Sequence, residues 1–208
     1  MNKFDLYCKS NLFKKLGLFI AFCLIIVGCD IFNTRDAEKP TQPRSDFQPA
    51  VAVDTLIKNL VNSLKDKDVI NYLACLSDTS FTNKKFHFSP SSEAASIYPT
   101  LIDWNLSSEE QYFKNMSIKV SSTSQIQLIL NESSRNITGD STIYTASYEL
   151  KLPFVNSSSE IIWQIYKGTL TFGMIRDNIR SVWSIYYWRD NKTGSEPSWS
   201  DLKGSMAN

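Results

Sequence analysis

Three side chains in this 208-residue chain combine acid–base chemistry with an apolar or aromatic neighbour, and they are Asp103 beside Trp104, His87 between two phenylalanines, and Glu149 between Tyr148 and Leu150. Proton transfer needs a group whose pKa is shifted by burial and a partner that orients it. Each of the three also has a simpler interpretation. Asp103 fits a solvated helix end, His87 fits the face opposite its phenylalanines unless a bulge exposes it, and Glu149 fits a polar strand face. Because no spacing ties any two of them together, we predict no catalytic residue.

Metal and cofactor chemistry is also disfavoured. His87 is the only histidine, and the chain has no Cys or His pair at metal-ligand spacing and no Gly-rich phosphate loop. The sequence therefore predicts neither a metal nor a cofactor.

Aromatic side chains are the second candidate feature, because residues 178–188 end with aromatic residues on both faces of an expected strand. One set should fill the interior. The other should lie at the surface, where an exposed aromatic patch often marks contact with a partner. We therefore predict Tyr186, Trp188 and Trp199 as ligand or partner contacts. The alternative is that Trp188 packs under the C-terminal tail through Trp199.

The first 28 residues have the layout of a secretory signal. Four lysines against one aspartate in residues 1–15 precede an apolar run over residues 16–27, which is shorter than the roughly twenty residues of a membrane-spanning helix. The sequence Ile-Val-Gly-Cys that ends at Cys29 resembles a bacterial lipobox, in which the cysteine is lipidated and the preceding peptide is removed. We predict a signal peptide over residues 1–28, lipid attachment at Cys29 and a location in the cell envelope. The alternative is an uncleaved anchor that contains a cysteine, and Asp30 leaves inner or outer membrane undecided.

Charge and cysteine content limit the partners of the remaining chain. The net charge is +1 with no basic block, which disfavours nucleic acid. Removal of the four lysines and one aspartate of the signal leaves 18 basic and 20 acidic side chains. Cys75 is then the only cysteine besides Cys29, so no disulfide can form within the chain. Its apolar neighbours predict a buried structural thiol.

Residues 29–50 are rich in proline and charge and are predicted to form a disordered tether, followed by a single domain over residues 51–208. An apolar stripe opened by Asp54 predicts a first helix, and Asp68 is expected to cap a second. Residues 86–88 predict a short strand, and residues 107–110 a capping box that opens a further helix. Alternating residues then predict strands over the ranges 123–131, 142–154, 161–176 and 178–188, with loops over 133–140 and 156–159. Helices followed by an antiparallel meander indicate an α+β domain with helices covering one face of the sheet.

The segment LKDKDVINYLACLSDTSF over residues 64–81 resembles the opening of the nuclear-transport-factor-2-like superfamily, which includes ketosteroid isomerases and polyketide cyclases. SVWSIYYWRDN followed by SWSDLKG resembles the last strand and tail of envelope-lipoprotein members of that superfamily. The resemblance covers residues 51–203 and implies a cone, in which helices pack on a strongly bent antiparallel sheet around a pocket. No catalytic residue of the family can be carried over to a position in this chain.

Two functional hypotheses follow. The first is a membrane-anchored, non-catalytic envelope lipoprotein, whose partners are the membrane through its lipid and a small apolar ligand or an envelope protein. The second is a small-molecule isomerase, cyclase or hydrolase-like enzyme that uses the same cavity. A cavity filled by the protein's own aromatic side chains would favour the first hypothesis or a purely structural role. A cavity that contains a buried carboxylate within hydrogen-bond reach of a tyrosine or a second acid would favour the second.

Overall fold

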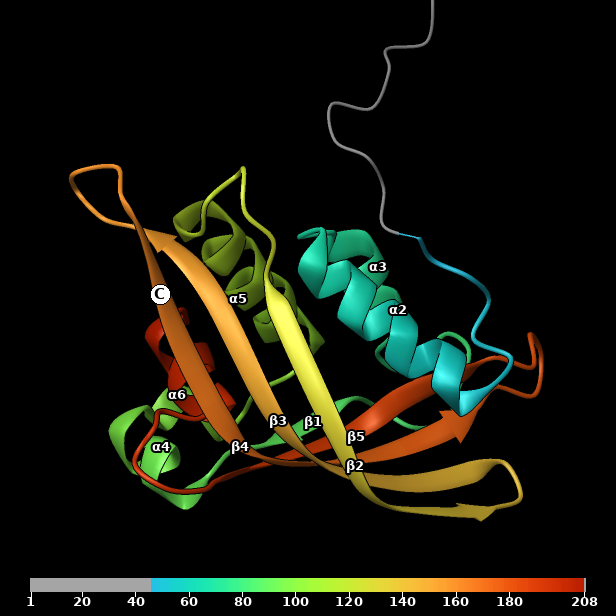
Figure 1. The fold of residues 1–208 in the computed structure, drawn as a ribbon. Helices are drawn as coiled ribbons and strands as arrows, with labels where there is room; N and C mark the ends of the chain where they lie inside the picture. The colour runs from blue at the N-terminus through green and yellow to red at the C-terminus, as the bar shows by residue number, and fades with distance from the viewer. Residues whose placement is uncertain (1–45, 208) are drawn as a thin grey trace, which may run out of the picture. The chain divides into compact units, whose positions relative to one another are not determined.

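The computed structural model describes residues 46–207, which form a curved five-stranded sheet with helices on one side (Figure 1). The predicted signal peptide, Cys29 and most of the predicted tether lie outside the described residues. Within residues 46–207, no helix combines the length and apolar character that crossing a membrane requires.

The elements follow the predicted order of helices first and a long meander afterwards, so the predicted α+β class is confirmed. In chain order they are α2 (Val53–Lys65), α3 (Val69–Ala74), β1 (His87–Ser89), α4 (Ser92–Ile97), η2 (Pro99–Leu101), α5 (Leu106–Lys119), β2 (Gln127–Thr138), β3 (Ser141–Val155), β4 (Ile161–Arg176), β5 (Trp183–Lys192) and α6 (Trp199–Ser205).

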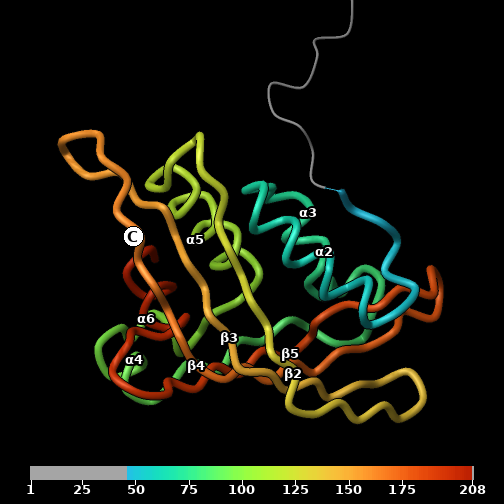
Figure 2. Tube along the Cα trace, viewed as in Figure 1, coloured from blue at the N-terminus to red at the C-terminus, as the bar shows by residue number. Residues whose placement is uncertain are grey.

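The sheet has the strand order β1-β5-β4-β3-β2, and its strand path is visible in Figure 2. The pairs from β2 to β5 are antiparallel, whereas β1 pairs with β5 in parallel and sets His87 opposite Tyr187. β1 is therefore an edge strand. The predicted loop over residues 133–140 is wrong, since β2 continues to Thr138 and the turn contains only Gly139 and Asp140. This part of the hairpin is largely exposed, so its residues lack the alternating burial that marks a strand in sequence.

Of the two helix starts predicted from aspartates, the structure confirms the cap at Asp68 and not the one at Asp54. Asp68 accepts a hydrogen bond from the backbone N–H of Asn71 at 3.0 Å and caps α3 as expected. Asp54, in contrast, lies within the first turn of α2 and pairs with Arg135 of β2. The Asp54 carboxylate and the Arg135 guanidinium thus join α2 to the sheet.

The predicted capping box over residues 107–110 is also wrong. The cap of α5 is Asn105, whose Oδ1 accepts from the backbone N–H groups of Ser107 at 2.9 Å and Ser108 at 3.3 Å. The capping box is formed by Asn105 and Ser108, so the Glu109 side chain takes no part in capping α5. Glu109 instead turns inward and is fully buried.

The domain begins before Val51. Ala50 is buried, and its carbonyl accepts a hydrogen bond from the backbone N–H of Trp183 at 2.8 Å. The Asn59 side chain donates to the carbonyl of Gln48 at 2.6 Å, and Phe47 packs against the core. Residues 47–50 therefore contact the domain that the sequence predicts from Val51 onward.

Candidate functional site

The concave side of the sheet is filled by large aromatic side chains. Trp188 of β5 and Trp199 of α6 meet at a centroid distance of 4.6 Å with nearly perpendicular rings. Phe88 of β1 meets the Trp188 ring edge-on at 5.9 Å, which is a favoured aromatic arrangement. These three side chains have no solvent exposure.

Trp188 and Trp199 are therefore core residues, and their predicted role as ligand or partner contacts is wrong for the folded domain. The alternative, in which Trp188 packs under the tail through Trp199, is what the structure shows. The backbone N–H of Trp199 donates to the Tyr148 hydroxyl at 2.7 Å, and its indole N–H donates to the Tyr112 hydroxyl at 2.9 Å. These bonds anchor α6 inside the bent sheet.

A buried ion pair lies next to this aromatic cluster. The Lys203 ammonium of α6 donates to Glu109 Oε1 of α5, and both side chains are fully buried. Glu109 also accepts from the Tyr72 hydroxyl and from the Trp104 indole N–H, each at 2.8 Å. Burial lowers the pKa of Lys203 below its usual value, and the negative charge of Glu109 offsets part of that shift.

A second buried carboxylate holds the start of α6. Asp190 of β5 accepts from the Tyr148 hydroxyl at 2.7 Å, and from the backbone N–H and hydroxyl of Ser200 at 2.7 and 2.5 Å. Burial raises the pKa of Asp190, while these hydrogen bonds act in the opposite direction. Gly168 leaves room for this arrangement, because a Cβ there would lie 2.6 Å from the Tyr148 hydroxyl.

The carboxylate and tyrosine pairs that would favour an enzyme are therefore present, but they face α6 rather than an open cavity. The carboxylates of Glu109 and Asp190 both accept hydrogen bonds from groups of the protein itself. Such fully satisfied buried networks hold a single packing arrangement. Side chains of the C-terminal helix α6 thus occupy the interior on the concave side of the sheet.

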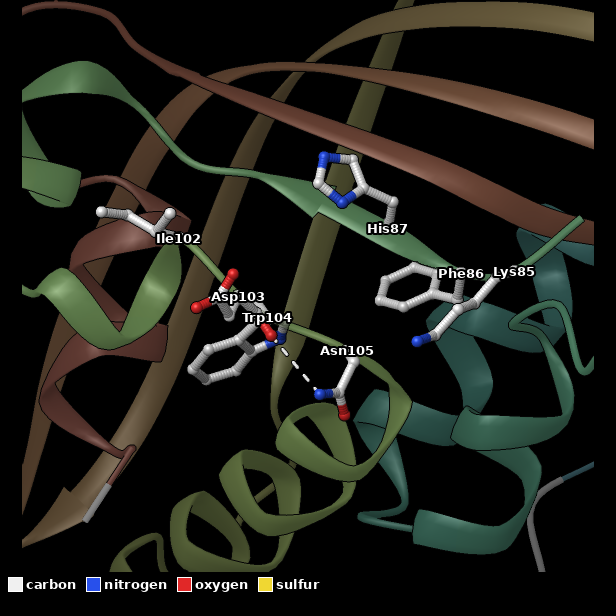
Figure 3. Close-up of a pocket in the computed structure, with 7 residues that line it drawn as sticks. All are labelled: Lys85, Phe86, His87, Ile102, Asp103, Trp104 and Asn105. Atoms are coloured by element: carbon white, nitrogen blue, oxygen red, sulfur yellow. Dashed lines mark hydrogen bonds between the residues drawn. The ribbon is translucent and has the colours of Figure 1, made fainter.

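An open groove lies on the outside, along the unpaired edge of β1 (Figure 3). It has a volume of about 420 Å³, within the range of small-ligand sites. One wall comes from the start of β1 and the other from the segment that leads into α5. The lining residues are Lys85, Phe86, His87, Ile102, Asp103, Trp104 and Asn105.

Two of the predicted acid–base candidates, His87 and Asp103, thus meet in one groove. His87 is exposed while Phe86 and Phe88 are buried, as strict strand alternation predicts. Asp103 is also exposed, and no hydrogen bond or ion pair joins it to His87 in the described structure. The groove therefore presents polar groups above a floor that includes Phe86 and Trp104, without an assembled acid–base pair.

Glu149, the third candidate, lies elsewhere. It is on the outward face of β3, where its carboxylate contacts the ammonium groups of Lys151 at 2.8 Å and Lys167 at 2.9 Å. Hydrogen bonds from these lysines lower the pKa of Glu149, which keeps it ionised. The predicted polar strand face is confirmed for this residue.

The outer surface next to the groove combines tyrosines with cations, and we call it the β1–β5 outer face, comprising Lys84, His87, Tyr186, Tyr187 and Arg189. The His87 and Tyr187 rings stack at 5.9 Å, and Arg189 Nε donates to the Tyr187 hydroxyl at 3.0 Å. The Lys84 ammonium lies 5.4 Å from the centre of the Tyr186 ring. Tyr186 is half-buried, so of the three predicted contact residues it alone remains at the surface.

Three cationic side chains near β1 have no carboxylate partner among the described residues. Within residues 46–207, no carboxylate lies within 4.0 Å of the charged nitrogens of Lys84, Lys85 or Arg189. The described residues also contain no group of three His, Cys, Asp or Glu side chains that could hold a metal ion. Among residues 46–207, the surface around β1 therefore combines aromatic rings with cations that have no carboxylate within 4.0 Å.

No protein-family model and no curated protein sequence matches the chain, but solved structures share its architecture. A candidate dehydratase of the NTF2-like family from Streptomyces avermitilis matches with a TM-score of 0.53 at 10% identity, over 69% of this chain and 95% of that one. This chain has the NTF2-like fold. A candidate aromatic ring hydroxylase from Novosphingobium aromaticivorans matches with a TM-score of 0.52 at 12% identity, over 74% of this chain and 94% of that one. A conserved protein from Planctomyces limnophilus matches with a TM-score of 0.52 at 10% identity, over 67% of this chain and 91% of that one.

These matches confirm the fold implied by the resemblance found in the sequence, and at such low identity they establish the fold alone. Within this NTF2-like fold, sequence analysis missed Glu109, Lys203 and Asp190 as buried charges. A signal for Lys203 exists, because Trp199 and Lys203 are spaced i, i+4 and Met206 is i+7 from Trp199. A helix with that spacing places a lysine on its apolar face.

Proposed function

We propose that this protein is a membrane-anchored, non-catalytic lipoprotein of the bacterial cell envelope, which recognises an envelope protein through the groove and the β1–β5 outer face. The observation that carries the proposal is the occupation of the concave interior by Trp199 and Lys203 of α6. A small apolar ligand cannot occupy the space that these side chains fill. Recognition is thereby assigned to the outer surface.

The chemistry of that surface favours an acidic partner. Lys84, Lys85 and Arg189 are cations without a carboxylate neighbour among residues 46–207. Tyrosine and arginine are enriched at the contact points of protein interfaces, because they offer rigid contact area together with hydrogen-bonding groups. The unpaired edge of β1 adds backbone groups to the same surface.

Lipid attachment at Cys29 rests on the lipobox-like sequence and its preceding signal. We expect mass spectrometry of the membrane fraction to find a chain that starts at Cys29 and carries acyl groups. Several acyl chains give tight anchoring, since each buried methylene contributes about 0.8 kcal/mol. A chain that retains residues 1–28, or a Cys29→Ala variant that remains bound to membranes, would contradict the anchor.

The recognition surface is tested by charge reversal. A photo-crosslinking residue at Ile102, which is exposed at the groove rim, should give a discrete adduct in the membranes of cells that make the protein. Replacing Lys85 and Arg189 by glutamate should reduce the adduct about tenfold or more, because both reversals repel an acidic partner. The control is Lys119→Glu, an exposed lysine of α5, which should leave the yield unchanged. Equal yields from all variants would refute the proposed surface.

The second functional hypothesis has its own outcome. His87 and Asp103 share a groove, so an enzyme would be revealed by turnover that is lost in Asp103→Asn. Turnover lost in Glu149→Gln would carry the same meaning. Either result would overturn the non-catalytic proposal.

A further inference from the structure

The Lys203 ammonium is enclosed by four aromatic rings and one carboxylate. Its Nζ lies 4.0 Å from the Trp188 centroid, 4.1 Å from Phe88, 5.3 Å from Tyr112 and 5.7 Å from Trp104. Cations bind favourably over aromatic faces within about 6 Å, most strongly where water is excluded. The carboxylate of Glu109 supplies the opposite charge. We call Phe88, Trp104, Glu109, Tyr112 and Trp188 the Glu109 cage.

None of the Glu109 cage belongs to α6. Phe88 and Trp188 come from the two strands β1 and β5, and the other members come from α5 or the residue just before its cap. Two hydrogen bonds, from Tyr72 and from Trp104, hold the carboxylate in position without any help from Lys203. The cage is therefore built by the rest of the domain, and only its occupant comes from the C-terminal helix.

We infer that the Glu109 cage is a binding site for a primary alkylammonium group, occupied in this chain by Lys203 as a ligand tethered through α6. The rings and the carboxylate recognise the charged head, and the buried surroundings accept the methylenes. A tethered ligand has a high effective concentration, so free amines do not compete while α6 is seated. This inference is independent of the proposed recognition surface.

The site should accept a free amine once the lysine head group is removed. Lys203→Ala deletes three methylenes and the ammonium group, which n-propylammonium replaces atom for atom. Buried cavities made by truncation are known to admit small ligands that match them. We expect n-propylammonium to raise the melting temperature of Lys203→Ala, with an apparent Kd of about 1 mM given the limited affinity of four heavy atoms. Wild-type protein and Lys203→Met should show no shift.

Charge recognition is separated from cavity filling by a neutral isostere. n-Propanol should bind Lys203→Ala about tenfold more weakly than n-propylammonium, since Glu109 remains without a cation. In Lys203→Ala/Glu109→Gln the preference should reverse in favour of n-propanol. The Trp104 indole proton, which is donated to Glu109, gives a direct resonance for both titrations.

Lys203→Ala leaves the Glu109 carboxylate buried without a cation, so the folding of this variant is measured with and without amine. If it is unfolded, n-propylammonium should restore the folded far-ultraviolet spectrum and n-propanol should not. Equal effects of amine and alcohol, or no effect of amine while Lys203→Ala/Glu109→Gln is folded, would overturn the inference. Neither outcome depends on an envelope partner, so the proposed function stands or falls separately.

Discussion

Replacing Glu109 by alanine should lower the free energy of unfolding at neutral pH by about 3–5 kcal/mol, because it leaves the Lys203 ammonium buried without a counter-charge. Proton release limits the contribution of the buried charge to this loss, since deprotonating a lysine with a usual pKa of about 10.4 costs roughly 5 kcal/mol at pH 7. Denaturant unfolding measures the loss. The matched control is Glu110→Ala, because Glu110 is the exposed neighbour that pairs with Lys114, and it should change stability by no more than about 0.5 kcal/mol.

The loss in Glu109→Ala should also depend on pH in a defined direction. In the folded variant Lys203 is uncharged, whereas the unfolded chain binds a proton at this side chain until the pH reaches its usual pKa. The unfolded state therefore binds more protons, and the stability of the variant should rise with pH by up to about 1.4 kcal/mol per unit between pH 7 and 10. A loss that is unchanged between pH 7 and 9.5 would contradict a Lys203 side chain that has released its proton in the folded variant.

A double variant tests whether the pair itself adds stability. Glu109→Leu together with Lys203→Met removes both charges and keeps apolar volume, so it should be far more stable than Glu109→Ala. The pair is thus expected to matter for the position of α6 more than for net stability. That expectation agrees with the cage, in which the carboxylate already has two other donors.

The strands could be predicted because burial alternates along them. Tyr144, Tyr148 and Leu150 of β3 are buried while Ser147 between them is exposed, and the sequence shows the same alternation. The outer half of β2 could not be predicted, because its residues are mostly exposed and burial does not alternate along it. The periodicity of apolar residues in a sequence indicates which side chains are buried. It therefore predicts a strand only where burial alternates along the strand.

The candidate site was predicted only in part, and the reason is physical. His87 and Asp103 were identified by type, but only the fold brings β1 next to the segment before α5. Charged residues are rarely fully buried unless they are paired, so residue type alone indicated surface positions for Lys203 and Glu109, although Lys203 lies at i+4 from Trp199. Their pairing joins residues of two distant segments, α5 and α6, and local sequence gives no sign of it. Tyrosine and tryptophan content predicted an aromatic contact surface, but most of that content fills the interior.

Replacing Trp199 by alanine should lower the melting temperature by about 6–20 °C. Truncating a fully buried tryptophan costs about 3–5 kcal/mol, and each kcal/mol corresponds to roughly 2–4 °C in a domain of this size. The variant also leaves the Tyr112 hydroxyl without its indole donor and opens space beside Trp188. The matched control is Trp163→Ala on β4, where the side chain is 44% exposed and the melting temperature should change by no more than a few degrees.

The same pair of variants separates a structural C-terminal helix from a functional one. If Trp199 seats α6 in the core, Trp199→Ala should loosen the hold on Lys203, and n-propylammonium should begin to stabilise the variant where it has no effect on wild type. The crosslinked adduct at Ile102 should persist at temperatures where the variant remains folded, because the groove does not include α6. A melting temperature close to that of wild type would mean that Trp199 is not packed inside the sheet. The interior would then be open to ligands, and the assignment of recognition to the outer surface would fail with it.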